Sequence, residues 1–115
     1  MNMSEQQRLC PLADIPEGEA RGFEFGRKSV VAVVRDGQLR TYLNWCPHLG
    51  IDLNFMPDEF LDMDRQFLMC ANHGALFEIE TGECLSGPCQ GESLVPVPHE
   101  IRDGDIWVTL VEPPL

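Results

Sequence analysis

The chain has 115 residues, 43% of them hydrophobic, and 19 acidic against 8 basic side chains give it a formal net charge of −11. This length suits one small core, so we expect residues 1–115 to form a single domain. Nucleic acid is excluded as an expected partner, because phosphates would be repelled. No apolar run approaches the roughly 20 residues of a membrane helix, and the polar start of the chain has no signal-peptide pattern. We therefore expect a soluble protein of the cytoplasm without membrane contact.

The negative charge is unevenly spread. Between Thr41 and Ile101 lie ten acidic residues and one basic residue, Arg65. One interpretation is a solvated face that keeps the protein soluble. The other is a docking face for a basic partner, because charge complementarity speeds the encounter of two proteins. Composition leaves both interpretations open.

Strand and turn patterns begin in the first half of the chain. Val30–Val34 is a short, mostly β-branched run that predicts a buried strand. Asp36-Gly37 follows, and Gln38–Leu43 then alternates polar and apolar residues. Because both turn residues tolerate a positive φ, this order predicts a β-hairpin.

Two more hairpins are predicted further along the chain. One turns at Thr81-Gly82, and the other turns at Asp103-Gly104 before an outgoing strand at Ile106–Leu110. Prolines disfavour helices across the second half, where only Pro57–Met63 is compatible with a helical turn. We expect an all-β domain of about eight to ten short strands in a small antiparallel architecture.

Two loops carry residues whose side chains are suited to binding a metal. The first reads CPHLG from Cys46 to Gly50, and the second reads CANHG from Cys70 to Gly74. Each loop offers one thiolate and one imidazole, which are ligands for zinc or for an iron–sulfur cluster. The candidate metal ligands are Cys46, His48, Cys70 and His73.

The spacing of these ligands favours the cluster over zinc. Structural zinc sites usually place like ligands together, with two to four residues between cysteines and three to five between histidines. Here each loop mixes a cysteine with a histidine. This arrangement suits a site in which two cysteines hold one iron and two histidines hold the other. A structural zinc site remains the alternative.

At these residues the sequence resembles the Rieske family of 2Fe–2S proteins, whose pattern is C-x-H, a spacer, and C-x-x-H-G. The similarity extends through Ala75–Phe77 to Gly87-Pro88, which resembles the family's proline loop over the cluster. The resemblance implies an antiparallel β-sandwich with a small cluster-binding subdomain at about 44–90. It also implies one 2Fe–2S cluster per chain, bound by the four candidate ligands. The spacer here is a few residues longer than usual.

The resemblance also implies a low reduction potential. Glycines at Gly50 and Gly74 let the backbone approach the cluster sulfurs. High-potential Rieske subunits of respiratory cytochrome complexes have a Ser and a Tyr that hydrogen-bond the cluster, and Ala75 and Phe77 stand at those positions. Their disulfide-forming cysteines are replaced here by Ile51 and Asn72. Because Ala75 and Phe77 lack the hydroxyl donors of the Ser and the Tyr, we expect a reduction potential near the low end for Rieske centres, about −150 mV.

The function implied by the resemblance is one-electron transfer. Similar ferredoxins carry electrons from a flavin-dependent reductase to a terminal oxygenase, and we expect a monomer that is not an enzyme by itself. The alternative is a Rieske-fold subunit of a larger oxidoreductase complex, such as the small subunit of a nitrite reductase. That subunit typically lacks the Cys and His ligands, so their presence here argues against it.

Three cysteines and one histidine lie outside the motif. Cys10, Cys84 and Cys89 are expected to be reduced thiols in a cytoplasmic protein. Cys84 and Cys89 flank the predicted proline loop, so a disulfide between them is the alternative. Additional metal ligation by these two is disfavoured, because the four-ligand set is already complete. His99 is expected to be structural or to face solvent.

Overall fold

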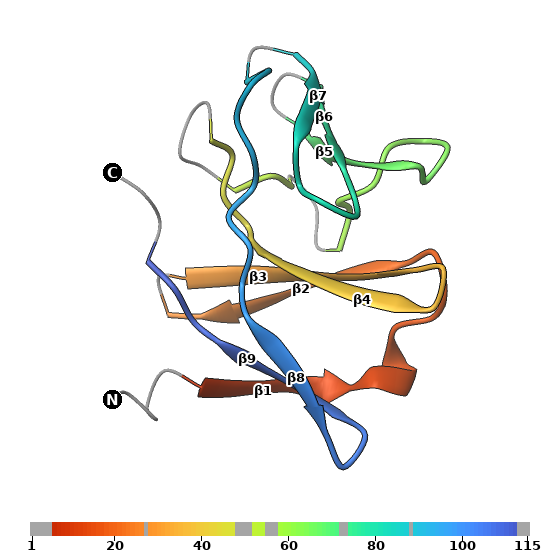
Figure 1. Cartoon of the computed structure of the whole chain (residues 1–115), viewed down its shortest axis with the longest axis vertical. Helices are drawn as coiled ribbons and strands as arrows, with labels where there is room; N and C mark the ends of the chain where they lie inside the picture. Colours follow the sequence, from red (N-terminus) through yellow and green to blue (C-terminus); the bar gives the residue numbers. More distant parts are fainter. Residues whose placement is uncertain are drawn as a thin grey trace.

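The computed structural model describes residues 6–26, 28–47, 52–54, 58–71, 74–87 and 89–112. Nine strands and one short 3-10 turn make up the regular structure of these residues (Figure 1). In chain order they are β1 (Gln6–Pro11), η2 (Leu12–Asp14), β2 (Ala20–Phe25), β3 (Lys28–Arg35), β4 (Gln38–Leu43), β5 (Phe67–Cys70), β6 (Ala75–Glu78), β7 (Cys84–Ser86), β8 (His99–Arg102) and β9 (Asp105–Thr109).

The strands form three antiparallel sheets of three strands each, in the orders β1-β9-β8, β2-β3-β4 and β5-β6-β7. Figure 1 shows β2-β3-β4 in the middle, with the β5-β6-β7 sheet on one side and the β1-β9-β8 sheet on the other. The prediction of an all-β antiparallel fold is therefore confirmed.

Strand β3 is buried on both faces, which explains its unbroken apolar sequence. Val30 and Ala32 belong to the core cluster that contains Ile106 of β9. Val31 and Val33 belong to a second core cluster, which contains residues of β5, β6 and β7. Because successive side chains of a strand point to opposite faces, one β-branched run supplies both cores.

The three predicted hairpins are confirmed. Asp36 and Gly37 join β3 to β4 with φ angles of 55° and 74°. Asp103 and Gly104 join β8 to β9 with φ angles of 52° and 83°. Gly82, with a φ of 80°, lies between β6 and β7. In the two Asp-Gly turns, both central residues have positive φ angles. These angles match the right-handed twist of the flanking strands, which is why Asp-Gly is favoured there.

The predicted helical turn at Pro57–Met63 is wrong for the described residues 58–63. The segment instead pairs with β5 through a Leu61–Leu68 bridge, and the amide N–H of Met69 donates to the carbonyl oxygen of Phe60 at 2.8 Å. Backbone pairing with a neighbouring strand outweighs local helix formation here. The turn at η2 was not predicted.

Two carboxylates organise the spacer between the two motif loops. Oδ1 of Asp62 accepts hydrogen bonds from the amides of Gln66 and Phe67 and so closes the turn before β5. Oδ1 of Asp58 accepts a hydrogen bond of 2.8 Å from the amide of Gly22 on β2. The spacer is therefore fastened both to the β5-β6-β7 sheet and to the central β2-β3-β4 sheet.

Glycine is required at position 22 by the close approach of a buried ring. Phe60 is 1% exposed. A Cβ atom placed on Gly22 would lie 2.8 Å from Cζ of Phe60. The absence of a side chain on β2 thus makes room for the aromatic ring that anchors the spacer.

Strand β4 of the central sheet makes contacts that hold the β5-β6-β7 sheet. The hydroxyl of Tyr42 donates to the carbonyl oxygen of Ile79 at 2.6 Å, and burial raises the pKa of Tyr42 to about 12. The chain that returns from β7 runs along β4, where Leu43 N–H donates to Val95 O and Val97 N–H donates to Thr41 O. These bonds hold the β5-β6-β7 sheet against the central sheet.

A buried asparagine joins the two motif loops just outside their cysteines. Asn44 is 6% exposed, and its Oδ1 accepts a hydrogen bond of 2.7 Å from the amide of Leu53. Its Nδ2 donates to Oδ1 of Asn54 at 2.9 Å. The carbonyl oxygen of Leu53 in turn accepts from the amide of Ala71, directly after Cys70, at 2.7 Å. Leu53 therefore connects the residues around Cys46 with those around Cys70.

We predict that Asn44→Ala destabilises the protein by about 1–3 kcal/mol, because the buried N–H of Leu53 loses its acceptor. The free energy of unfolding, measured with urea and circular dichroism, checks this value. The midpoint urea concentration of unfolding should be lower for this variant than for the wild type.

Asn54→Ala is the matched control. It removes one partner of the Asn44 amide and keeps the bond to Leu53. The control should cost clearly less than Asn44→Ala, and equal losses in the two variants would contradict the role given to Leu53.

Candidate metal centre

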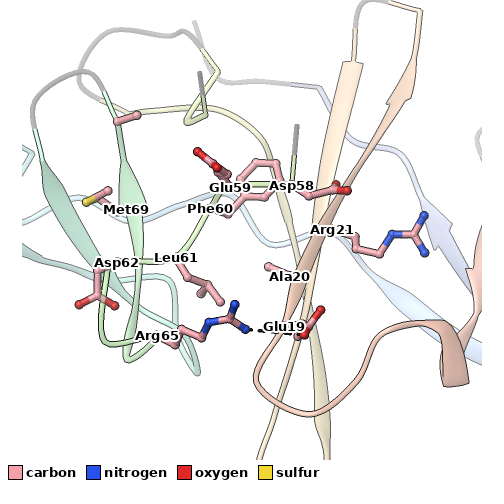
Figure 2. Close-up of a pocket in the computed structure, with 11 residues that line it drawn as sticks. Glu19, Ala20, Arg21, Asp58, Glu59, Phe60, Leu61, Asp62, Arg65 and Met69 are labelled. Carbon is pink, nitrogen blue, oxygen red and sulfur yellow. Dashed lines mark ion pairs between the residues drawn. The ribbon is translucent and has the colours of Figure 1, made fainter. Parts of the chain in front are cut away.

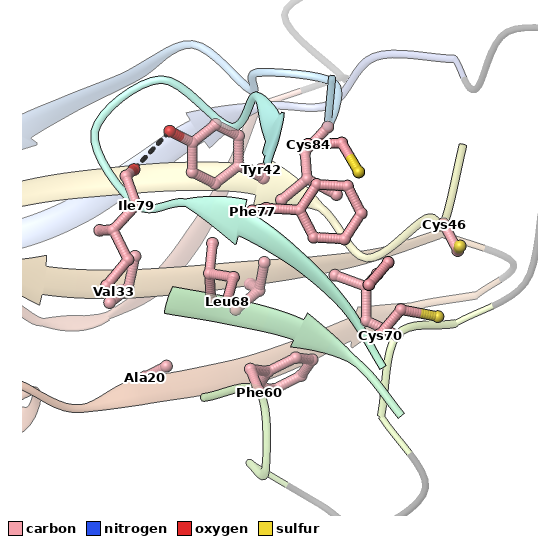
Figure 3. Packing of buried hydrophobic residues seen from close by; sticks show 14 of the residues in the cluster. Ala20, Val33, Tyr42, Cys46, Phe60, Leu68, Cys70, Phe77, Ile79 and Cys84 are labelled. Carbon is pink, nitrogen blue, oxygen red and sulfur yellow. Dashed lines mark hydrogen bonds between the residues drawn. The ribbon is translucent and has the colours of Figure 1, made fainter. Parts of the chain in front are cut away.

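Cys46 and Cys70 lie at the same end of one core cluster. Cys46 follows β4, Cys70 ends β5, and both residues are 0% exposed. Figure 3 shows their sulfur atoms at the end of the cluster beyond Leu68, where the ring of Phe77 also points. The fold therefore brings together two of the four predicted ligands, which are 24 positions apart in the sequence.

The second motif loop is a tight connection between β5 and β6. Cys70 and Ala75 are paired across the two strands, and the amide of Gly74 donates to the carbonyl oxygen of Cys70 at 2.8 Å. Gly74 has a φ of 69°, a conformation that residues with a Cβ rarely adopt. The glycine of the motif is thus required by the turn itself.

Several predicted site residues lie outside the described residues. These are the candidate ligands His48 and His73, together with Gly50, Ile51, Asn72 and Pro88. Within the described part of the chain, no group of three or more His, Cys, Asp and Glu side chains is arranged to hold a metal ion. The four-ligand set therefore stays a prediction of the sequence.

The surroundings of Cys46 and Cys70 fit an iron–sulfur cluster. Both sulfurs lie among apolar side chains, where a bare thiolate would be costly. Ferric iron compensates that cost, because it holds its cysteine ligands as thiolates and neutralises their charge. Two buried cysteines at one end of an apolar core are thus a suitable half of a cluster site.

Ala75 and Phe77 are both 0% exposed on β6. Gly87, with a φ of 108°, packs directly on this strand: a Cβ atom at that position would lie 2.8 Å from Cα of Ala75. The segment after β7 therefore rests against the strand that follows the second loop.

The structure adds a contact that sequence reasoning left open. The Sγ atoms of Cys84 and Cys89 are 3.1 Å apart, and both residues carry thiols. They are 2% and 0% exposed, and burial raises the pKa of Cys89. Cys10 also carries a thiol but belongs to the other core cluster.

His99 has a structural contact, in agreement with the sequence analysis. Its Nδ1 lies 3.0 Å from Oγ1 of Thr41, whose hydroxyl donates to the carbonyl oxygen of Val97 at 2.6 Å. Partial burial and the nearby charge of Arg40 lower the pKa of His99. The residue therefore fastens β8 to β4.

An open groove of about 520 Å³ lies between β2 and the spacer (Figure 2). Its described lining contains no cysteine or histidine, and Arg65 lies 3.7 Å from Glu19 across it. The groove therefore offers carboxylates and guanidinium groups but no ligand of the predicted motif. No helix in the described residues is long and apolar enough to cross a membrane.

Curated proteins similar to this chain include dioxygenase ferredoxin subunits and cytochrome-complex iron-sulfur subunits. The chain is 31% identical over 104 residues to the 3-phenylpropionate/cinnamic acid dioxygenase ferredoxin subunit of Escherichia coli K12, which covers 90% of this chain and 92% of that protein. It is 34% identical over 76 residues to the cytochrome b6-f complex iron-sulfur subunit of Chlorobaculum thiosulfatiphilum. The chain spans 38% of that subunit and 51% of its counterpart from Chlorobaculum tepidum.

Solved structures show the same fold at low sequence identity. The ferredoxin of carbazole 1,9a-dioxygenase from Nocardioides aromaticivorans IC177 matches with a TM-score of 0.71 and 18% identity, covering 90% of this chain and 96% of that one. A complex of reduced oxygenase and oxidized ferredoxin in carbazole 1,9a-dioxygenase contains a chain that matches equally well, with 21% identity.

The family model for the Rieske [2Fe-2S] domain matches residues 5–103, a range that contains both motif loops and strands β1 to β8 but not β9. This match selects the iron–sulfur cluster over the zinc alternative. With two buried cysteines at the end of a three-layered antiparallel fold, the chain belongs to the Rieske [2Fe-2S] domain family, and its cofactor is a 2Fe–2S cluster.

Proposed function

We propose that this chain is a one-electron carrier whose cluster is held by Cys46, His48, Cys70 and His73. The observation that carries the proposal is the burial of Cys46 and Cys70 at one end of a core in a chain of the Rieske family. The cluster supplies reversible uptake of one electron. The protein supplies the thiolates, a dry environment on the side of Leu68 and Phe77, and loops held in register by Asn44.

The proposed partners are a flavin-dependent reductase as donor and a terminal oxygenase as acceptor. The similarity to a dioxygenase ferredoxin subunit over 92% of its length supports this placement. We include in the proposal a cytoplasmic location, a monomeric state and a single domain over residues 1–115. The cluster-binding subdomain at about 44–90 contains the whole β5-β6-β7 sheet, which supports its boundaries.

A subunit of a larger oxidoreductase complex is the second candidate function. The relatives from cytochrome b6-f complexes favour it, but the chain spans only 38% and 51% of their length. Ala75 and Phe77 also lack the hydroxyl groups expected in high-potential cytochrome subunits. A carrier of low potential therefore agrees better with the residues of β6.

Ligand substitution tests the site. Cys46→Ser and Cys70→Ser should each abolish the visible absorption and the Rieske electron paramagnetic resonance signal, because each removes a thiolate that binds iron. Cys10→Ser is the matched control, since Cys10 is buried in the other core cluster. A wild-type signal in either of the first two variants would show that the ligand assignment is wrong.

The potential depends on hydrogen-bond donors near the cluster. Phe77→Tyr adds a hydroxyl to a ring that points toward the sulfurs of Cys46 and Cys70 (Figure 3). The reduced cluster carries one more negative charge, so it gains more from the new donor. A differential gain of about 1 kcal/mol raises the potential by roughly 40 mV.

Protein-film voltammetry measures this shift. Phe67→Tyr serves as the control, because Phe67 lies at the opposite end of β5 from Cys70. An unchanged potential in an intact Phe77→Tyr protein would contradict the role assigned to Phe77.

The acidic segment is proposed to guide a basic partner to the cluster. Asp58 and Asp62 accept backbone hydrogen bonds, so their removal would disturb the spacer as well as the charge. Glu59, Asp64 and Glu92 are exposed, and their side chains make no hydrogen bond or ion pair among the described residues. These three carboxylates are therefore the ones to neutralise.

We predict that electron transfer to cytochrome c, a basic one-electron acceptor, slows as salt shortens the Debye length from about 30 Å to about 8 Å. The triple variant Glu59→Gln, Asp64→Asn and Glu92→Gln should weaken this salt dependence. Stopped-flow kinetics at several salt concentrations gives the slope.

The control variant removes the same amount of charge outside the acidic segment, with Asp14→Asn, Asp103→Asn and Glu112→Gln. It should retain more of the wild-type slope than the first variant does. Equal slopes in both variants would leave net charge, and not a docking face, as the cause.

A further inference from the structure

The thiols of Cys84 and Cys89 form a pair that the electron-carrier function does not use. Cys84 lies on β7 opposite Phe77, and Cys89 follows five positions later. Their Sγ atoms are 3.1 Å apart, whereas a disulfide bond is about 2.05 Å long. A movement of about 1 Å would therefore bring the two sulfurs to bonding distance.

One residue holds the backbone of both cysteines. The amide of Cys84 donates to the carbonyl oxygen of Glu92 at 2.8 Å, and the amide of Glu92 donates to the carbonyl oxygen of Cys89 at 2.9 Å. The amide of Gln90 also donates to the carbonyl oxygen of Gly87 at 3.3 Å. The two sulfurs are therefore brought together by a closed loop and not by chance contact of flexible side chains.

The hydrogen bonds of the pair fit two protonated thiols. The S–H of Cys84 donates to the carbonyl oxygen of Ser86 at 3.5 Å. The S–H of Cys89 is then the donor in the contact between the two sulfurs. Neither group has a charged partner within these contacts, so the resting state is the dithiol.

We propose that Cys84 and Cys89 are a redox-active pair that low-molecular-weight disulfides, such as oxidised glutathione, convert to an intramolecular disulfide. In the first step, one thiol loses its proton and attacks the small disulfide, which forms a mixed disulfide and releases one small thiol. The second cysteine then attacks the protein sulfur of that mixed disulfide and releases the other small thiol. The protein loses two electrons and two protons, and the small disulfide gains them.

Burial sets the pace of this reaction. Both cysteines are almost fully buried, and protonated thiols are poor nucleophiles. The chain between the two cysteines is exposed at Leu85, which is 40% exposed, and at Ser86 and Gly87. Attack therefore follows opening of this outer segment, and the pair reacts more slowly than a surface thiol.

The proposed ligand set is complete without this pair, so Cys84 and Cys89 are not assigned to the metal. Cys89 nevertheless lies in the same core cluster as Cys46 and close enough to interact with it electrostatically. Cys46 and Cys70 stay with the cluster while the pair is oxidised. Since the segment from Cys84 to Gly87 rests on Ala75, the disulfide would stiffen the layer that covers β6.

The experiment equilibrates the cluster-loaded protein with glutathione buffers of increasing oxidised fraction, followed by acid quenching, alkylation and intact mass measurement. The wild type should lose two of its five thiols in one transition, with a mass lower by about 2 Da before alkylation. Peptide mapping should place the bond between Cys84 and Cys89. The visible absorption before quenching should stay unchanged, which reports that the cluster is retained.

Three variants complete the test. Cys84→Ser and Cys89→Ser should each lose the transition and form a mixed disulfide with glutathione at the remaining cysteine of the pair. Cys10→Ser should behave as the wild type, with two of four thiols lost. No thiol loss in the wild type at any glutathione ratio would overturn the proposal, and so would a disulfide mapped to other cysteines. If a variant fails to fold, the proposal is decided by the measurement on the wild type alone.

Discussion

The hydrogen bonds at Leu53 are the constraint on which the site depends. If the two loops share the cluster as proposed, Cys46 and Cys70 have to keep a fixed separation, although Cys46 follows β4 and Cys70 ends β5. The Leu53 amide donates to the side chain of Asn44, and its carbonyl oxygen accepts from Ala71. A polar group buried without a partner is costly, so this short network has one satisfied arrangement. The position of one loop thereby determines the position of the other.

The layered core supports this arrangement from below. The central sheet is packed on both faces, with Val30 on one side of β3 and Val31 on the other. Tyr42 extends from that sheet to Ile79, and Phe60 fastens the spacer over Gly22. A site held by such packing moves little when its charge changes by one unit. This property suits a protein whose proposed work is to gain and lose one electron.

The sequence allowed prediction of those features that depend on neighbouring residues alone. Asp36-Gly37 and Asp103-Gly104 need a positive φ, so the hairpins could be placed from the residues alone. The ligand candidates were found by their spacing within each loop. The role of Asn44 was missed, because its partner is nine positions away and no motif marks it. The helical turn expected around Pro57–Met63 was wrong, because pairing with β5 is a tertiary contact that local propensity does not reveal.

The acidic segment shows why charge counts alone do not define a docking face. Asp58 and Asp62 direct their carboxylates to backbone N–H groups, and these contacts fold the spacer. Such carboxylates stabilise the chain, so selection for structure explains their presence without any partner. Glu59 and Asp64 lie between and beside them, are exposed, and make no comparable contact within the described residues. No contact of these two carboxylates helps to fold the described part of the spacer, so the proposed docking role rests on them and not on the segment as a whole.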